Sequence, residues 1–139
     1  MTLTILDTDV LTLFQHGDPL VVCRVESLPL SHLAVTIISV EEELTGWYTR
    51  LLRARKREQL AHVYGRLTAA VRFLARLQIL TFSEPAIARY EQLRSTYRRL
   101  GKNDLRIASI VLDKAGVLAT RNVRDFRQIK GLQIEDWSQ

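Results

Sequence analysis

Short apolar runs alternate with longer helical segments along the chain, and this alternation restricts the possible folds more than any other feature. The expected strands are residues 2–6, 33–37, 78–82, 116–120 and 132–137. Parallel strands need a long crossover between them, usually a helix. We therefore predict an α/β sandwich, with a short parallel sheet of four or five strands and helices on both faces. Because 139 residues is the length of one ordinary domain, we expect residues 1–139 to form a single domain.

Capping residues and apolar spacing predict where the helices lie between these strands. The first helix is expected to stop near Gly17. The expected starts of the later helices are Asp18, Ser39, Ser83 and Asn103. The helix from Ser39 and a helix over residues 58–77 each have one apolar stripe, so we expect a helical hairpin. The helix over residues 104–115 is apolar nearly all round and is expected to be buried.

Charge is distributed unevenly along the chain. Residues 1–49 hold seven acids and one base, whereas residues 50–139 hold nineteen bases and eight acids. The basic excess suggests a polyanionic partner, because arginine side chains match the geometry of phosphate oxygens. A solvated basic surface explains the same excess equally well.

Composition also restricts the compartment in which the chain works. The single cysteine, Cys23, leaves no internal disulfide framework and no cysteine cluster for zinc. No apolar run of about 18 residues could span a bilayer, and the start "MTLTILDTDV" lacks the pattern of a secretion signal. We expect a soluble, cytoplasmic protein.

Four acidic residues fall at one edge of the predicted sheet. Asp7 ends the first strand, Glu42 lies in the first turn of the helix after the second strand, Asp104 opens the buried helix, and Asp125 follows the fourth strand. Ligands of such sheets bind at the carboxyl ends of the strands. Crowded carboxylates repel one another unless a cation lies between them, and Mg²⁺ or Mn²⁺ prefers oxygen ligands. None of the three histidines is near these acids in sequence, so zinc or iron suits the set less well.

Each acid also has a simpler interpretation. Asp9 is more readily a cap of the first helix than a metal ligand. Glu42 stands three residues after Ser39, which is the spacing of a capping box. Asp104 and Asp125 could be favourable charges at helix starts. Asp7 is the hardest to explain in this way, and the simpler interpretations together do not account for all four acids.

Four motifs occur in order along the chain: "LDTDVL", "ISVEEELTGW", "GKNDLRIA" and "ATRNVRDFRQIKGLQIEDW". With these motifs the chain resembles the VapC-type toxins of bacterial toxin–antitoxin systems, which are PIN-domain ribonucleases, over essentially its whole length. The resemblance implies a PIN-like three-layer sandwich and a metal-dependent endoribonuclease that cleaves tRNA or another structured RNA. A metal-activated water would hydrolyse the phosphodiester and leave 5′-phosphate and 3′-hydroxyl ends.

The resemblance also implies roles for particular residues. The catalytic and metal-binding quartet would be Asp7, Glu42, Asp104 and Asp125. Supporting side chains would be Asn122, Thr8 and Thr120. Among three adjacent glutamates, the distance to Gly46 selects Glu42 rather than Glu41 or Glu43. Asp9 stays outside this set.

Partners follow from the same resemblance. Bases expected to hold RNA phosphates are Lys102, Arg106, Arg121 and Arg124. Side chains expected to form part of an antitoxin groove are Trp47, Tyr48, Leu51 and Leu52. A homodimer is expected, and operator DNA would be bound only through the complex with the antitoxin.

Two other interpretations remain open. Haloacid-dehalogenase phosphatases also begin with a strand and paired aspartates, but here Leu11 replaces the expected threonine or valine and no later aspartate pair follows. The chain could instead be a non-catalytic basic module that binds nucleic acid or a protein partner, with its acids acting only as caps.

Overall fold

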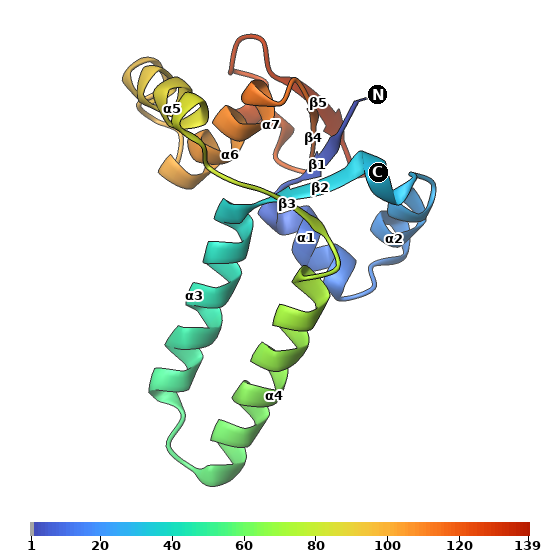
Figure 1. Ribbon diagram of the computed structural model, residues 1–139, viewed down its shortest axis with the longest axis vertical. Coiled ribbons are helices and arrows are strands. Elements are labelled where there is room, and N and C mark those ends of the chain that lie inside the picture. The colour runs from blue at the N-terminus through green and yellow to red at the C-terminus, as the bar shows by residue number, and fades with distance from the viewer. Residues whose placement is uncertain (1) are drawn as a thin grey trace.

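The computed structural model describes residues 2–139, which form a five-stranded parallel sheet with helices on both faces (Figure 1). The strands are β1 (Thr4–Leu6), β2 (Leu33–Thr36), β3 (Gln78–Leu80), β4 (Val117–Thr120) and β5 (Gln133–Asp136). Their order across the sheet is β3-β2-β1-β4-β5, and every neighbouring pair is parallel. The predicted three-layer α/β sandwich is confirmed.

Alternate residues of the central strands point to opposite faces of the sheet. Ile5 of β1 and Leu118 of β4 pack with the helices α5 (Glu84–Thr96), α6 (Lys102–Asp113) and α7 (Val123–Phe126). Leu6 and Ala119 pack on the other face with α1 (Thr8–Gln15) and α2 (Pro19–Glu26). A short 3-10 turn, η1 (Leu30–His32), precedes β2. Since α6 lies between α5 and the sheet and buries residues on most of its sides, its predicted burial is confirmed.

The two longest helices, α3 (Ile37–Arg53) and α4 (Arg57–Leu74), form the predicted hairpin. Figure 1 shows this hairpin projecting away from the sheet as an arm. The backbone N–H groups of Arg55 and Lys56 both donate to Oε1 of Gln59, which closes the turn between the helices. Within residues 2–139, no helix combines the length and apolar character needed to cross a membrane.

Two predicted helix starts are wrong. The cap of α3 is Thr36, whose hydroxyl accepts from the backbone N–H of Ser39 at 3.3 Å, so the capping box of Ser39 with Glu42 does not form. Asn103 does not cap α6, because that helix begins at Lys102. In both places the helix starts before the polar residue that the sequence pattern favoured.

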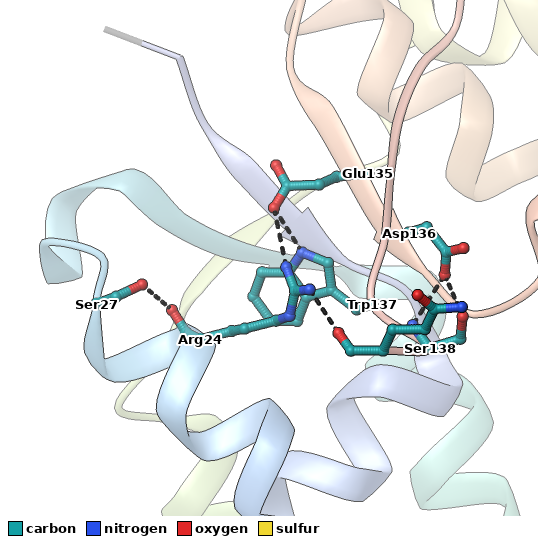
Figure 2. Close-up of polar contacts among 7 residues, drawn as sticks. Arg24, Ser27, Glu135, Asp136, Trp137 and Ser138 are labelled. Carbon is teal, nitrogen blue, oxygen red and sulfur yellow. Dashed lines mark hydrogen bonds and ion pairs between the residues drawn. The ribbon is translucent and has the colours of Figure 1, made fainter.

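The C-terminal segment is fixed against α2 by a cluster around Arg24 and Trp137 (Figure 2). Trp137 is only 2% exposed, and its indole N–H donates to Glu135 at 2.8 Å. The Arg24 guanidinium lies 5.7 Å from the centroid of the indole ring, 3.7 Å from the Glu135 carboxylate and 2.5 Å from the backbone oxygen of Gln139. The ion pair is partly exposed and contributes little by itself, so burial of the indole ring is the main stabilising term.

Two glycines give a matched test of how tightly the core packs around Ile5 of β1. A Cβ on Gly116 would lie 2.8 Å from Cδ1 of Ile5, whereas a Cβ on Gly65 in α4 would meet nothing within 4 Å. We expect Gly116→Ala to lower the free energy of unfolding by about 1–3 kcal/mol through overpacking. Gly65→Ala is expected to raise it by about 0.5–1 kcal/mol, because alanine loses less entropy in a helix. Urea denaturation measures both, and a Gly116→Ala midpoint equal to that of the unsubstituted chain would contradict the packing described.

Candidate active site

The candidate site lies where the strand order reverses. The chain passes from β1 through β2 to β3 on one side of the sheet and continues on the other side of β1 with β4 and β5. Asp7 follows β1 and Thr120 ends β4, and the Thr120 hydroxyl donates to Oδ2 of Asp7 at 2.5 Å. Such a reversal leaves a crevice at the carboxyl ends of the strands, which is the usual ligand site of open α/β sheets.

Asp7 also caps helix α1. Its Oδ1 accepts from the backbone N–H of Val10 at 2.9 Å, and its own backbone is extended, as an N-cap requires. The prediction that Asp9 caps this helix is therefore wrong, because the helix begins one residue after Asp7. Asp9 lies in the first turn, where its exposed side chain lines a cavity with Arg121 and Asn122.

Burial raises the pKa of the Asp7 carboxyl to about 6, since the side chain is only 5% exposed. The hydrogen bonds from Thr120 and Val10 act in the opposite direction, and the charges of Asp9 and Asp104 raise the pKa further. Two hydrogen bonds therefore do not offset the cost of burying this charge.

Glu42 is held by Thr8, the residue directly after Asp7. The Thr8 hydroxyl donates to Oε1 of Glu42 at 2.7 Å and lies 2.8 Å from the Ser39 hydroxyl. Of the three adjacent glutamates, Glu43 instead accepts from Gln15 at 2.7 Å, and Glu41 is exposed. Glu42 is thus the glutamate of this run that contacts the residue beside Asp7.

Asp125 and Asp104 complete the acidic group. The side-chain amide of Asn122 donates to Asp125 at 3.1 Å, and the backbone N–H of Asn122 donates to the Thr120 hydroxyl at 2.9 Å. Asp104 is half-buried in the first turn of α6. Burial raises its pKa, and the charges of Glu42, Asp125 and Asp9 raise it further. All four predicted acids, together with Asp9, therefore contribute to one negative field.

The donor chemistry of this group fits a hard divalent cation. The ligands would all be carboxylate oxygens, and a cation would relieve the repulsion that raises the pKa of Asp104. In the described part of the chain, however, no three Asp, Glu, His or Cys side chains are arranged so that they could hold one metal ion together. Oxygens of Asp7, Glu42 and Asp125 are instead engaged in the hydrogen bonds above. Side-chain rotation is needed to bring them onto one ion, and the metal site stays a prediction.

The four bases predicted to bind phosphate lie around the acids but differ in exposure and in contacts with other side chains. Lys102, Arg121 and Arg124 are exposed. Arg106 is half-buried, lies 5.1 Å from the centroid of the Tyr90 ring and donates to Asn103 at 2.7 Å. Three of the four bases are thus open to a ligand, and their role stays a prediction.

The residues predicted for an antitoxin groove divide into two kinds. Tyr48 and Leu52 are exposed on the hairpin, at 54% and 85%. Leu51 and Trp47 are half-buried, and the Trp47 ring has the guanidinium of Arg50 at 4.6 Å and that of Arg66 at 5.6 Å from its centroid. Trp47 therefore packs within the hairpin, while Tyr48 and Leu52 face solvent.

Sequence reasoning missed the part that Ser39 plays in the site. Its hydroxyl is buried against Thr8 and so belongs to the network that holds Glu42. The signal available was a hydroxyl residue three positions before the glutamate, which we interpreted only as a helix cap.

No family model matches the chain. It is 30% identical over 115 residues to the tRNA(fMet)-specific endonuclease VapC of Salmonella typhimurium, and the match covers 80% of each protein. It is 36% identical over 69 residues to ribonuclease VapC2 of Rickettsia felis, a match that covers 47% of this chain and spans only about half (52%) of that relative. Among solved structures, the DNA-bound VapBC of Salmonella typhimurium aligns with 99% of each chain, a TM-score of 0.78 and 25% identity.

The raised pKa of Asp7 predicts a specific dependence of stability on pH. The pKa of the Asp7 carboxyl is about 6 in the folded chain and 3.8 in the unfolded chain. Its contribution to the stability of the fold is therefore fully present below pH 3.8 and is lost as the pH rises through about 6. Asp7→Asn removes the titration, so the variant is expected to gain up to about 3 kcal/mol relative to the unsubstituted chain between pH 4 and pH 7. Denaturation in EDTA at several pH values measures this difference.

Asp136→Asn is the matched control for this prediction. Hydrogen bonds from Ser138 hold the pKa of the exposed Asp136 carboxyl below its usual value of 3.8, so the difference for that variant is expected to stay nearly constant between pH 4 and pH 7 and to change, in the opposite direction, only at lower pH. An Asp7→Asn difference that does not vary between pH 4 and pH 7 would contradict the burial of a charge at the end of β1.

Proposed function

The chain belongs to the VapC family of ribonucleases, and on that premise we propose that it is a metal-dependent endoribonuclease, the toxin of a type II toxin–antitoxin pair. The observation that carries this proposal is the field shared by Asp104, Glu42 and Asp125 at the point where the strand order reverses. A crevice that concentrates negative charge favours a divalent cation, and RNA hydrolysis by such a site needs one.

In this proposal the ion, Mg²⁺ or Mn²⁺, would be held by Asp7, Glu42, Asp104 and Asp125. When bound, it would supply water activation and charge neutralisation for the hydrolysis of a phosphodiester. The chain has no need of a covalent nucleophile, so the work of its own side chains is to position the acids.

Three hydrogen-bonding residues do this positioning. Thr8 holds Glu42 at 2.7 Å, and Asn122 holds Asp125 at 3.1 Å. Thr120 donates to Asp7 and accepts from the backbone N–H of Asn122, so one hydroxyl links the ends of β1 and β4 to the start of α7. Partners of this kind orient metal ligands and restrict their rotamers.

The substrate proposed is tRNA or another structured RNA, cleaved in a single-stranded loop where the bases are accessible. The relative from Salmonella typhimurium is named for a tRNA, which supports this choice. Phosphates would be held by the bases around the acids, which are Lys102, Arg106, Arg121 and Arg124. Such contacts position the strand without reading its sequence.

A cognate antitoxin is the proposed protein partner. The Salmonella typhimurium structure is a VapBC complex bound to DNA, so operator DNA is proposed to be bound through the toxin–antitoxin complex. The antitoxin would lie along the α3–α4 hairpin, which exposes Tyr48 and Leu52 and has Trp47 and Leu51 beside them. The proposed compartment is the cytoplasm, because the RNA substrate is found there. The proposed working form is a homodimer, as the family resemblance implies.

Nuclease assays test the proposed function directly. We expect cleavage of RNA with Mg²⁺ or Mn²⁺, none in EDTA, and 5′-phosphate and 3′-hydroxyl ends in the sequenced products. Asp104→Asn is expected to abolish cleavage while circular dichroism and RNA binding stay unchanged. Cleavage that continues in EDTA would overturn the metal dependence. A folded chain that binds RNA but cleaves none with either metal would support the non-catalytic basic module.

Thr8→Val tests whether the hydroxyl network serves the acids. Because the variant loses the hydrogen bond to Glu42, we expect activity or metal affinity to fall about 10–100-fold. Thr49→Val is the control, since Thr49 bonds only to the backbone oxygen of Thr45 on the exposed part of α3. The metal concentration that gives half-maximal cleavage is the measurement. Equal effects of the two substitutions would mean that Thr8 has no particular role.

A further inference from the structure

A basic cavity of about 710 Å³ lies between the end of α5 and the start of α6. Arg94, Arg98 and Lys102 line it, together with one acid, Glu91. The volume falls in the range of about 300–1,000 Å³ that is typical of ligand pockets. None of the residues in the acidic group lines this cavity, but Lys102, one of the bases expected to hold RNA phosphates, does, so the cavity adjoins the site described above.

The three bases have no carboxylate partner in this cavity. Across residues 2–139, no carboxylate oxygen lies within 4.0 Å of a charged nitrogen of Arg94, Arg98 or Lys102. Arg94 makes a long contact of 3.5 Å with the Tyr90 hydroxyl, and Arg98 one of 3.4 Å with the backbone oxygen of Ser95. Most guanidinium donors therefore remain free to bind a ligand, and the excess of positive charge favours an anion.

The aromatic part of the cavity wall is already fixed. The Tyr90 ring is buried, with Arg106 5.1 Å from its centroid and Phe82 packed edge-on at 5.9 Å. The Tyr97 hydroxyl accepts from the backbone N–H of Lys130 at 3.0 Å. A wall that does not need to reorganise reduces the entropy lost on binding.

The cavity comes close to the acidic site at Gly101. Gly101 lines the cavity, and a Cβ built on it would lie 3.7 Å from Oδ2 of Asp104. Two residues that line the cavity, Gly101 and Lys102, therefore lie beside Asp104 at the start of α6, and a polyanion bound at the acidic site has the basic cavity next to it. A concave pocket of this size admits an unstacked nucleotide, which single-stranded RNA offers and a duplex does not.

Resting on the ribonuclease function proposed above, we propose that this cavity binds a nucleotide of single-stranded RNA next to the cleaved bond. Arg94, Arg98 and Lys102 hold its phosphate. Arginine suits this role because its planar fork matches two phosphate oxygens. These interactions add affinity and fix the path of the strand without selecting a base.

Paired charge removals test the proposal with the full chain in EDTA, so that bound RNA is not cleaved. The cavity variant is Arg94→Gln with Arg98→Gln. The control is Arg55→Gln with Arg57→Gln, which removes the same charge from residues at the tip of the hairpin, far from α5 (Figure 1). Fluorescence anisotropy measures the affinity for a short single-stranded RNA at several salt concentrations.

We expect the slope of log affinity against log salt to decrease by about 1.4 in the cavity variant, or about 0.7 for each arginine that no longer neutralises a phosphate. The control is expected to keep a slope near that of the unsubstituted chain. Arg94→Lys with Arg98→Lys, which keeps the charge, is expected to retain most of the slope, and a circular dichroism spectrum of the glutamine variant equal to that of the unsubstituted chain would exclude misfolding.

An unchanged slope in the cavity variant, or equal effects in the cavity variant and the control, would overturn the proposal. The absence of RNA binding by the unsubstituted chain would also overturn it. If the cavity variant lost affinity for duplex DNA as much as for RNA, the cavity would be part of a DNA-binding surface instead. Failure of the proposed function is distinguishable, because RNA binding that depends on the cavity without metal-dependent cleavage leaves the cavity assigned and removes the nuclease. Metal-dependent cleavage with an unchanged KM in the cavity variant would keep the nuclease and remove the cavity as an RNA-binding site.

Discussion

The burial of a carboxylate at the carboxyl end of the central strand is the constraint on which the site depends. Asp7 follows the end of β1 beside the end of β4 with only 5% of its surface exposed, and neighbouring acids add to the cost of its charge. The chain reduces this cost with hydrogen bonds from Val10 and Thr120. The pKa is nevertheless raised to about 6, so the charged Asp7 carboxylate lowers the stability of the fold. The apolar layers on the two faces of the sheet must offset this cost.

Much of the fold could be predicted because strand and helix patterns are local. Each strand is a short apolar run bounded by turns, and the hairpin follows from two helical stripes joined by a short connection. The helix starts were harder, because a cap depends on where the preceding strand ends. Thr36 stands inside an apolar run and is the last residue of β2, yet its hydroxyl also caps α3, a second role that the pattern of a strand does not indicate.

The acidic group could be predicted in outline but its internal contacts could not. The carboxyl ends of parallel strands share one edge, so the positions of Asp7 and Asp125 along the chain already indicated that they lie near each other. Whether Asp7 or Asp9 caps helix α1 depends on where that helix begins. The pattern of apolar residues does not specify this start to within two residues. The cavity between α5 and α6 left no signal, because the short connection between the two helices shows that their ends are near each other but not that the packing of Leu105 and Tyr90 leaves a hollow there.

Helix α3 joins the acidic group to the hairpin. Glu42 lies in its first turns, and Trp47 and Arg50 follow on the same helix. A cavity of about 340 Å³ is lined by these three residues and by Thr8, so it opens from the hydrogen bond that holds Glu42 toward the paired helices. Trp47, which belongs to the surface proposed for the antitoxin, and Glu42, which belongs to the site proposed for RNA hydrolysis, therefore line one cavity, and the two surfaces adjoin each other.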